Sequence, residues 1–267
     1  MTQIAAVQMT STTDVRANVA EATRLVREAA EAGARLAVLP ENFALMAGTR
    51  EQLLAIGEAY GAGPIQEATA DAARMHAIWV VAGTIPLTAP RERVRAACIV
   101  YDDRGEPVAR YDKIHLFDVE LRDGESHFES RVIEPGDQVA VVDTPAGRLG
   151  LSICYDLRFP ELYRQLLDRG AEVVAIPSAF TAYTGRAHWA PLVRARAIEN
   201  LVYVVAAAQV GLHAKGRETY GHSMVVDPWG VVVSELARGP GVVIADVDPG
   251  RMAQLRSQLP SIEHRRL

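Results

Sequence analysis

Four short apolar segments in the first half of the chain recur in the same order in the second half. The pairs are residues 3–9 with 148–154, 33–40 with 170–177, 77–84 with 201–208, and 98–105 with 223–230. The second pair shows the likeness best, since GARLAVLP matches GAEVVAIP. Matches that keep one order predict two similar halves, and this constrains the fold more than any other feature.

Each half alternates between β-branched runs and stretches rich in Ala, Arg, Glu and Leu, which is the pattern of strands covered by helices. The first helix has readable ends, because Thr12 and Asp14 precede it and Gly33 follows its last turn. A single half would leave one face of its sheet bare, so the two sheets should pack face to face. We therefore expect an α/β fold with helices outside, as one domain over residues 1–267.

Composition excludes several kinds of partner. The chain has 267 residues, of which 49% are hydrophobic and 23% charged, as in ordinary globular proteins. Its apolar runs fall short of the roughly 20 residues that span a bilayer, and its first residues lack the pattern of a signal peptide. The formal charge is −5 and the basic residues are dispersed. We expect a cytoplasmic protein with a small-molecule partner, and neither nucleic acid nor membrane.

Metal binding is not expected either. The chain has two cysteines, Cys98 and Cys154, and its seven histidines form no HxxxH or HExxH pair. Cys98 lies in the middle of the predicted strand AACIVY, which favours a buried structural role.

Cys154 has a different setting. The segment RLGLSIC predicts a strand, YDLRF a turn, and Pro160 the start of a helix. A strand-to-helix elbow exposes its side chain and directs backbone N–H groups toward a reacting centre. A thiol with a pKa near 8.5 needs a base or a cation to become a nucleophile. Three histidines remain open as that helper: His115, His188 and His222.

Two other side chains could activate the thiol. Glu41 follows a predicted strand in the apolar segment AVLPENFAL, where partial desolvation would raise the pKa of its carboxyl group and suit it to a general base. Lys113 lies among Tyr111, Ile114 and Leu116, an apolar setting for an ammonium group. It is either a lysine that extends from a strand end to solvent or a cation that stabilises an oxyanion.

The motifs LPENF, RYDKIHLFD and GLSICYDLRFPEL, in this order, resemble the nitrilase superfamily of carbon–nitrogen hydrolases. The resemblance covers nearly the whole chain and implies a Glu-Lys-Cys triad of Glu41, Lys113 and Cys154. It also implies a four-layer α-β-β-α sandwich, a homodimer, and no cofactor or metal. Glu129 matches the family's second glutamate, and the backbone N–H of Tyr155 would complete the oxyanion site.

Later segments, including IPSAFTAYTGRAHW and YGHSMVVDPWG, resemble the Nit branch, and within it the deaminated glutathione amidases. That likeness implies hydrolysis of an amide between 2-oxoglutarate and cysteinylglycine through a thioester. Arg158 would bind the oxo-carboxylate or brace the elbow, and Phe180 and Thr181 would line the pocket.

Two alternatives stay open: an ω-amidase that releases ammonia from 2-oxoglutaramate, and a binding module of the same fold without turnover. The acidic segment VELRDGESH predicts mobility in the loop 116–128.

Overall fold

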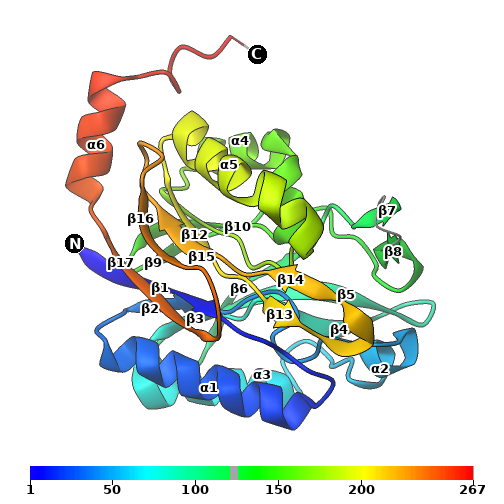
Figure 1. Ribbon diagram of the computed structural model, residues 1–267. Helices are drawn as coiled ribbons and strands as arrows, with labels where there is room; N and C mark the ends of the chain where they lie inside the picture. The colour runs from blue at the N-terminus through cyan, green and yellow to red at the C-terminus, as the bar shows by residue number, and fades with distance from the viewer. Residues whose placement is uncertain (121–125, 267) are drawn as a thin grey trace.

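The computed structural model describes residues 1–120 and 126–266, and its centre is a pair of facing β-sheets (Figure 1). The first sheet has the order β17-β1-β2-β3-β5-β4, with β6 paired to β5. Its strands are β1 (Thr2–Gln8), β2 (Leu36–Val38), β3 (Trp79–Val81), β4 (Ile85–Ala89), β5 (Arg93–Tyr101), β6 (Pro107–Asp112) and β17 (Gly241–Val247). The second sheet has the order β16-β15-β12-β11-β10-β9. Its strands are β9 (Val141–Thr144), β10 (Gly147–Leu151), β11 (Val173–Ala175), β12 (Tyr203–Ala206), β15 (Ser223–Val226) and β16 (Val232–Leu236).

Helices cover the outer face of each sheet and complete the four layers (Figure 1). On the first sheet lie α1 (Val15–Glu31) and α3 (Pro64–His76), and on the second lie α4 (Pro160–Asp168) and α5 (Ala182–Asn200). The remaining helices are α2 (Arg50–Ala55) and α6 (Pro249–Gln258). The predicted α/β sandwich is confirmed, and α1 begins and ends as its sequence indicates: the Asp14 side chain accepts the Ala17 N–H, and Gly33 has a φ of +96°.

The internal repeat is confirmed strand by strand. In the first sheet β1, β2 and β3 are parallel neighbours and β5 is antiparallel to β3. In the second sheet β10, β11 and β12 are parallel and β15 is antiparallel to β12. Even a local irregularity recurs, because the helix before the third strand ends on a left-handed residue in both halves: Ala77 with φ +48° and Leu201 with φ +49°.

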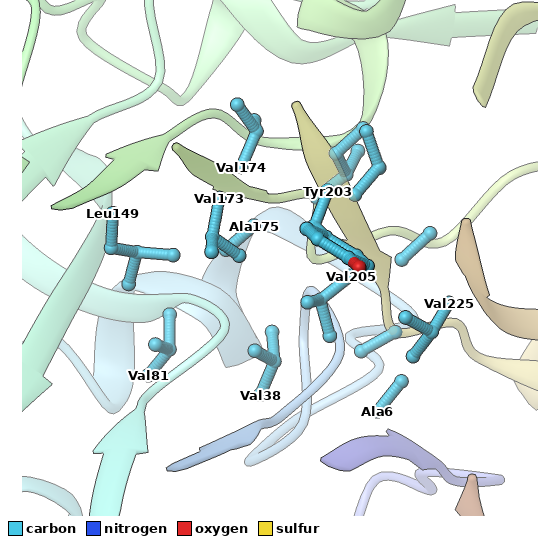
Figure 2. Packing of buried hydrophobic residues seen from close by; sticks show 14 of the residues in the cluster. Ala6, Val38, Val81, Leu149, Val173, Val174, Ala175, Tyr203, Val205 and Val225 are labelled. Carbon is cyan, nitrogen blue, oxygen red and sulfur yellow. The ribbon is translucent and has the colours of Figure 1, made fainter. Parts of the chain in front are cut away.

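The main core lies between the two sheets (Figure 2). Side chains of a strand alternate between its faces, so Ala6 points toward the second sheet whereas its neighbours Ala5 and Val7 pack under the helices. Across the interface, Val38 and Val81 of the first sheet and Leu149 and Val205 of the second belong to one buried cluster (Figure 2). Packing between the two sheets therefore fixes the position of one half relative to the other.

The two ends of the chain meet in one sheet. Strand β17 pairs antiparallel with β1 along its whole length, from Thr2 opposite Val247 to Gln8 opposite Gly241. The last strand of the second half thus forms the edge of the first sheet.

Two hairpins and three 3-10 helices complete the described chain. They are β7 (Asp118–Glu120) with β8 (Ser126–Phe128), β13 (Val210–Leu212) with β14 (Glu218–Tyr220), and η1 (Glu129–Arg131), η2 (Cys154–Arg158) and η3 (Ala214–Gly216). The prediction of mobility for residues 116–128 stays a prediction, because residues 121–125 of that loop lie outside the described residues. No helix of the described residues has the length and apolar character that crossing a membrane requires.

Candidate active site

Cys154 occupies the elbow that its sequence predicts. Strand β10 ends at Leu151, η2 begins at Cys154 itself, and α4 begins at Pro160. The cysteine has a φ of +47°, a left-handed value that costs a residue with a Cβ about 1–2 kcal/mol. Its N–H donates to the carbonyl of Pro177 at 2.8 Å, which helps to hold this conformation. Strain of this kind is typical of nucleophile elbows, where the side chain must leave the path of the strand.

Asp156 braces the elbow from within. Its buried carboxylate accepts the Ile153 N–H at 2.8 Å and, from the segment around the lysine, the Tyr111 hydroxyl at 2.7 Å. The backbone N–H of His115 donates to it at 3.0 Å, and the His115 ring Nδ1 lies 2.7 Å from it. A buried carboxylate with this many donors is satisfied without a cation. Asp156 thus ties the cysteine segment of one half to the lysine segment of the other.

Lys113 lies between two carboxylates in the interior. Its Nζ is 2.7 Å from Glu41 Oε1, 2.8 Å from Glu129 Oε2 and 3.0 Å from Glu129 Oε1. The residue is 1% exposed and Glu41 is 3% exposed, so the ammonium group is a permanent part of the interior and not a lysine extended to solvent. Glu129 is further held by the Phe117 N–H at 2.8 Å. The four residues of the predicted constellation, Cys154 included, are brought together.

The charges of this cluster set its resting protonation. Burial opposes the charge of Lys113 most strongly, but the carboxylates of Glu129 and Glu41 outweigh it and keep its pKa well above the ordinary value. The pKa of Cys154 is also raised, first by burial and then by the negative charge of Glu41, while Lys113 and the Ala179 backbone N–H act in the opposite direction. The resting state is therefore a neutral thiol beside a charged lysine.

The three histidines that could have activated the thiol contact other residues instead. His115 bonds to Asp156 and stacks on Phe159 at 3.7 Å between ring centroids. The Nδ1 of His188 lies 3.2 Å from a guanidinium nitrogen of Arg158, and His222 bonds to Glu235. Glu41 and Lys113 instead act electrostatically on the thiol.

Two hollows adjoin the cluster and share Glu41, Glu129 and Arg217. The first contains the thiol, with the predicted residues Tyr155, Arg158, Phe180 and Thr181 on its walls. Arg158 lies over the rings of Phe180 and Tyr155, at 5.2 Å and 5.7 Å. The second is the larger of the two and is lined by residues that include Asn42, Met46, Thr84 and Ile133.

Three participants were missed by the sequence reasoning. Asp156 was visible in CYDLRFPEL but carried no sign of its partners, and the Ala179 N–H is a backbone group in the second half. Arg217 lies on the walls of both hollows although it is 63 residues from the cysteine in the sequence. A basic residue before YGHS was the one available signal.

Cys98 is fully buried in β5, and burial raises the pKa of its thiol. Within residues 1–120 and 126–266, no group of three or more His, Cys, Asp or Glu side chains is arranged to hold a metal ion.

Two α/β halves that enclose a cysteine, a lysine and two glutamates define a hydrolase of the carbon–nitrogen class. The chain belongs to this family, since residues 3–257 match the carbon-nitrogen hydrolase family. Among curated relatives, the deaminated glutathione amidase of Synechocystis is 42% identical over 98% of this chain and 97% of the relative. The human deaminated glutathione amidase is 43% identical over 98% of this chain and 82% of the relative.

Solved structures agree on the fold. The NitFhit protein of C. elegans superposes with a TM-score of 0.91 at 40% identity, and the match covers 99% of this chain and 65% of that chain. An amidase variant from Nesterenkonia sp. AN1 superposes with a TM-score of 0.81 at 28% identity, covering 97% of this chain and 98% of that one. That variant was solved after Michael addition of acrylamide at its active site cysteine.

Proposed function

We propose that the protein hydrolyses a linear amide through a thioester on Cys154, with Glu41 as the base and Lys113 as the oxyanion-binding cation. The observation that carries the proposal is the position of Lys113 Nζ, 2.7 Å from Glu41 and 2.8 Å from Glu129 beside the buried thiol. A catalytically silent relative has no use for a desolvated lysine between two acids, so the binding-module alternative has less support.

In the first half-reaction, a carboxylate oxygen of Glu41 takes the thiol proton as the sulfur attacks the amide carbon. The carbonyl oxygen becomes an oxyanion, which Lys113 Nζ and the Tyr155 N–H stabilise. The C–N bond then breaks, and Glu41 returns the proton to the leaving nitrogen. An acyl thioester and a free amine result.

In the second half-reaction, Glu41 takes a proton from a water molecule as that water attacks the thioester carbon. The C–S bond breaks, the acid is released, and the proton restores the Cys154 thiol. Glu129 holds Lys113 in place throughout, because it shares the ammonium protons with Glu41. The cycle needs neither metal nor cofactor.

For the substrate, we propose the amide between 2-oxoglutarate and cysteinylglycine, the deaminated form of glutathione. The relatives from Synechocystis and human carry that name at 42% and 43% identity. Arg158 supplies a cation for the oxo-carboxylate, and Phe180 and Thr181 form the wall beside it. The physiological role would then be metabolite repair.

The nucleophile is tested by intact-mass spectrometry after brief exposure to acrylamide or an amide substrate. We expect a single adduct on the native protein, none on Cys154→Ala, and an unchanged adduct on Cys98→Ala. An adduct that survives in Cys154→Ala, or that disappears in Cys98→Ala, refutes the assignment of the nucleophile.

The substrate is tested by comparing the release of cysteinylglycine from deaminated glutathione with the release of ammonia from 2-oxoglutaramate. Turnover of the primary amide alone would favour the ω-amidase alternative, which uses the same catalytic residues. Equal or faster release of cysteinylglycine is expected.

Three further proposals concern the whole protein: one domain over residues 1–267, a cytoplasmic location and a homodimer. Ile198 of α5 and Trp229 and Val231 beside β16 are exposed apolar side chains, as an interface between two copies would require. Light scattering after size exclusion measures the assembly, and a mass near the 29.0 kDa of one chain would contradict the dimer.

A further inference from the structure

Arg217 stands at the border between the two hollows of the active site. It follows η3, directly after the left-handed residues Lys215 and Gly216, and its side chain lines both hollows together with Glu41 and Glu129. One terminal nitrogen, Nη2, donates to the carbonyl of Ala179 at 3.0 Å. The backbone N–H of this same Ala179 acts to lower the pKa of the Cys154 thiol, so Arg217 is anchored to a residue that influences the nucleophile.

The hydrogen bonding of the Arg217 guanidinium group is incomplete. Its Nε is buried and has no hydrogen-bond partner among residues 1–120 and 126–266. A buried polar atom without a partner is uncommon, because it has lost its water and gained nothing in return. No carboxylate of the described chain lies within ion-pair distance of Arg217, whereas its neighbour in the second hollow, Arg95, pairs with Asp112 at 3.4 Å.

The pocket therefore holds two guanidinium groups that the described acidic residues do not neutralise. Arg158 belongs to the smaller hollow, which contains the thiol, and Arg217 reaches the larger one, where the leaving half of an amide has room. A guanidinium group binds a carboxylate through parallel N–H bonds, and Nη1 of Arg217, unlike its Nε, is neither buried nor bonded to a described residue.

We propose that Arg217 binds a carboxylate on the leaving amine of the substrate, while Arg158 serves the acyl half. The inference rests on the proposed amidase function and adds the residue that recognises the acid group on the leaving half of the substrate. The accessible end of the guanidinium group, at Nη1, binds the substrate carboxylate and holds the scissile nitrogen toward Glu41.

The experiment compares two substrates with one acyl group: deaminated glutathione, whose leaving amine ends in a carboxylate, and 2-oxoglutaramate, whose leaving amine is ammonia. For Arg217→Gln we expect kcat/KM to fall about 100-fold on the first, mainly through KM, and less than 3-fold on the second. Arg158→Gln is the matched control and should lose activity on both. Circular dichroism confirms that each variant is folded.

A change in the substrate provides an independent measurement. Conversion of the terminal carboxylate of deaminated glutathione to a carboxamide should lower kcat/KM of the native enzyme by a similar factor. The same change should have little further effect on Arg217→Gln, because the partner is already gone. The kcat/KM of Arg217→Lys on deaminated glutathione should lie between those of the native enzyme and Arg217→Gln, since lysine keeps the charge but loses the parallel N–H groups.

Equal losses on both substrates, or no loss on either, would overturn the role of Arg217 while leaving the amidase function intact. Additive losses from the variant and the carboxamide would overturn it as well. A native enzyme that hydrolyses only 2-oxoglutaramate also overturns the inference. A native enzyme that hydrolyses neither substrate instead contradicts the proposed function, and the inference with it.

Discussion

At the scale of single residues, Lys113 is the group on which the site depends electrostatically. It is one of only two lysines in the chain and lies buried, while Lys215 is exposed. Its charge offsets two carboxylates and also lowers the pKa of the neighbouring thiol, which burial and Glu41 raise. Loss of the charge should therefore affect stability, thiol reactivity and turnover together.

Lys113→Met should lower kcat at least 100-fold, about 3 kcal/mol of transition-state stabilisation, by analogy with the loss of an oxyanion donor. Thermal unfolding should occur at a lower temperature, because the Glu41 carboxylate stays buried without its cation. Alkylation of Cys154 at pH 9 should slow as well. Glu129→Gln is the comparison, since it leaves Lys113 paired with Glu41; a larger loss of kcat in Glu129→Gln would contradict this ranking.

The residues that could be predicted are those whose local sequence carries their chemistry. Cys154 before a turn and Pro160, Glu41 after a buried strand, and Lys113 among apolar residues each stand out in their own segment. The resemblance to a family added Glu129, which no local pattern marked. Arg217 reaches the site through a contact with Ala179, and such long-range partners depend on how the loops of the second half fold.

At the scale of elements, the repeat accounts for most of what could be predicted about the fold. The four pairs of segments correspond to β1 and β10, β2 and β11, β3 and β12, and β5 and β15. Edge strands such as β4, β9 and β17 have no counterpart in the pattern, because their pairing depends on tertiary neighbours more than on their own sequence.

The left-handed ends of α3 and α5 allow a matched pair of substitutions. Ala77 is exposed, so Ala77→Gly removes a Cβ from an unfavourable conformation and should raise the free energy of unfolding by up to about 1 kcal/mol. Leu201 is 1% exposed, so Leu201→Gly should destabilise by roughly 2 kcal/mol or more through lost packing. Urea unfolding measures both, and a destabilised Ala77→Gly would contradict the explanation.

At the scale of the whole molecule, buried thiol and phenol groups should make the free energy of unfolding decrease at alkaline pH. Burial raises the pKa of Cys98, Tyr111 and Tyr163. Above pH 9 to 10 these groups ionise in the unfolded chain and stay protonated in the folded one, so the unfolded state binds fewer protons. With respect to these groups, the free energy of unfolding has its highest value below about pH 8. It falls as pH rises, by about 1.4 kcal/mol per pH unit for each group.

Cys98→Ala isolates one of these groups. The variant should be less stable than the native protein at pH 8, because it loses a buried sulfur. Between about pH 9.5 and 10.5 its stability should fall less steeply, by about 1.4 kcal/mol per pH unit. Urea unfolding at several pH values measures the two slopes, and parallel curves would show that the Cys98 thiol is not the source.

The pairing of β17 with β1 has a consequence during synthesis of the chain. Residues 2–8 are synthesised more than 230 residues ahead of their partner strand, Gly241–Val247. At about 5–20 residues per second, the open edge of β1 waits roughly 10–50 s for its partner. An unpaired strand edge is a template for other chains. The nascent chain is therefore exposed to edge-to-edge association along β1 until β17 is made and closes that edge of the first sheet.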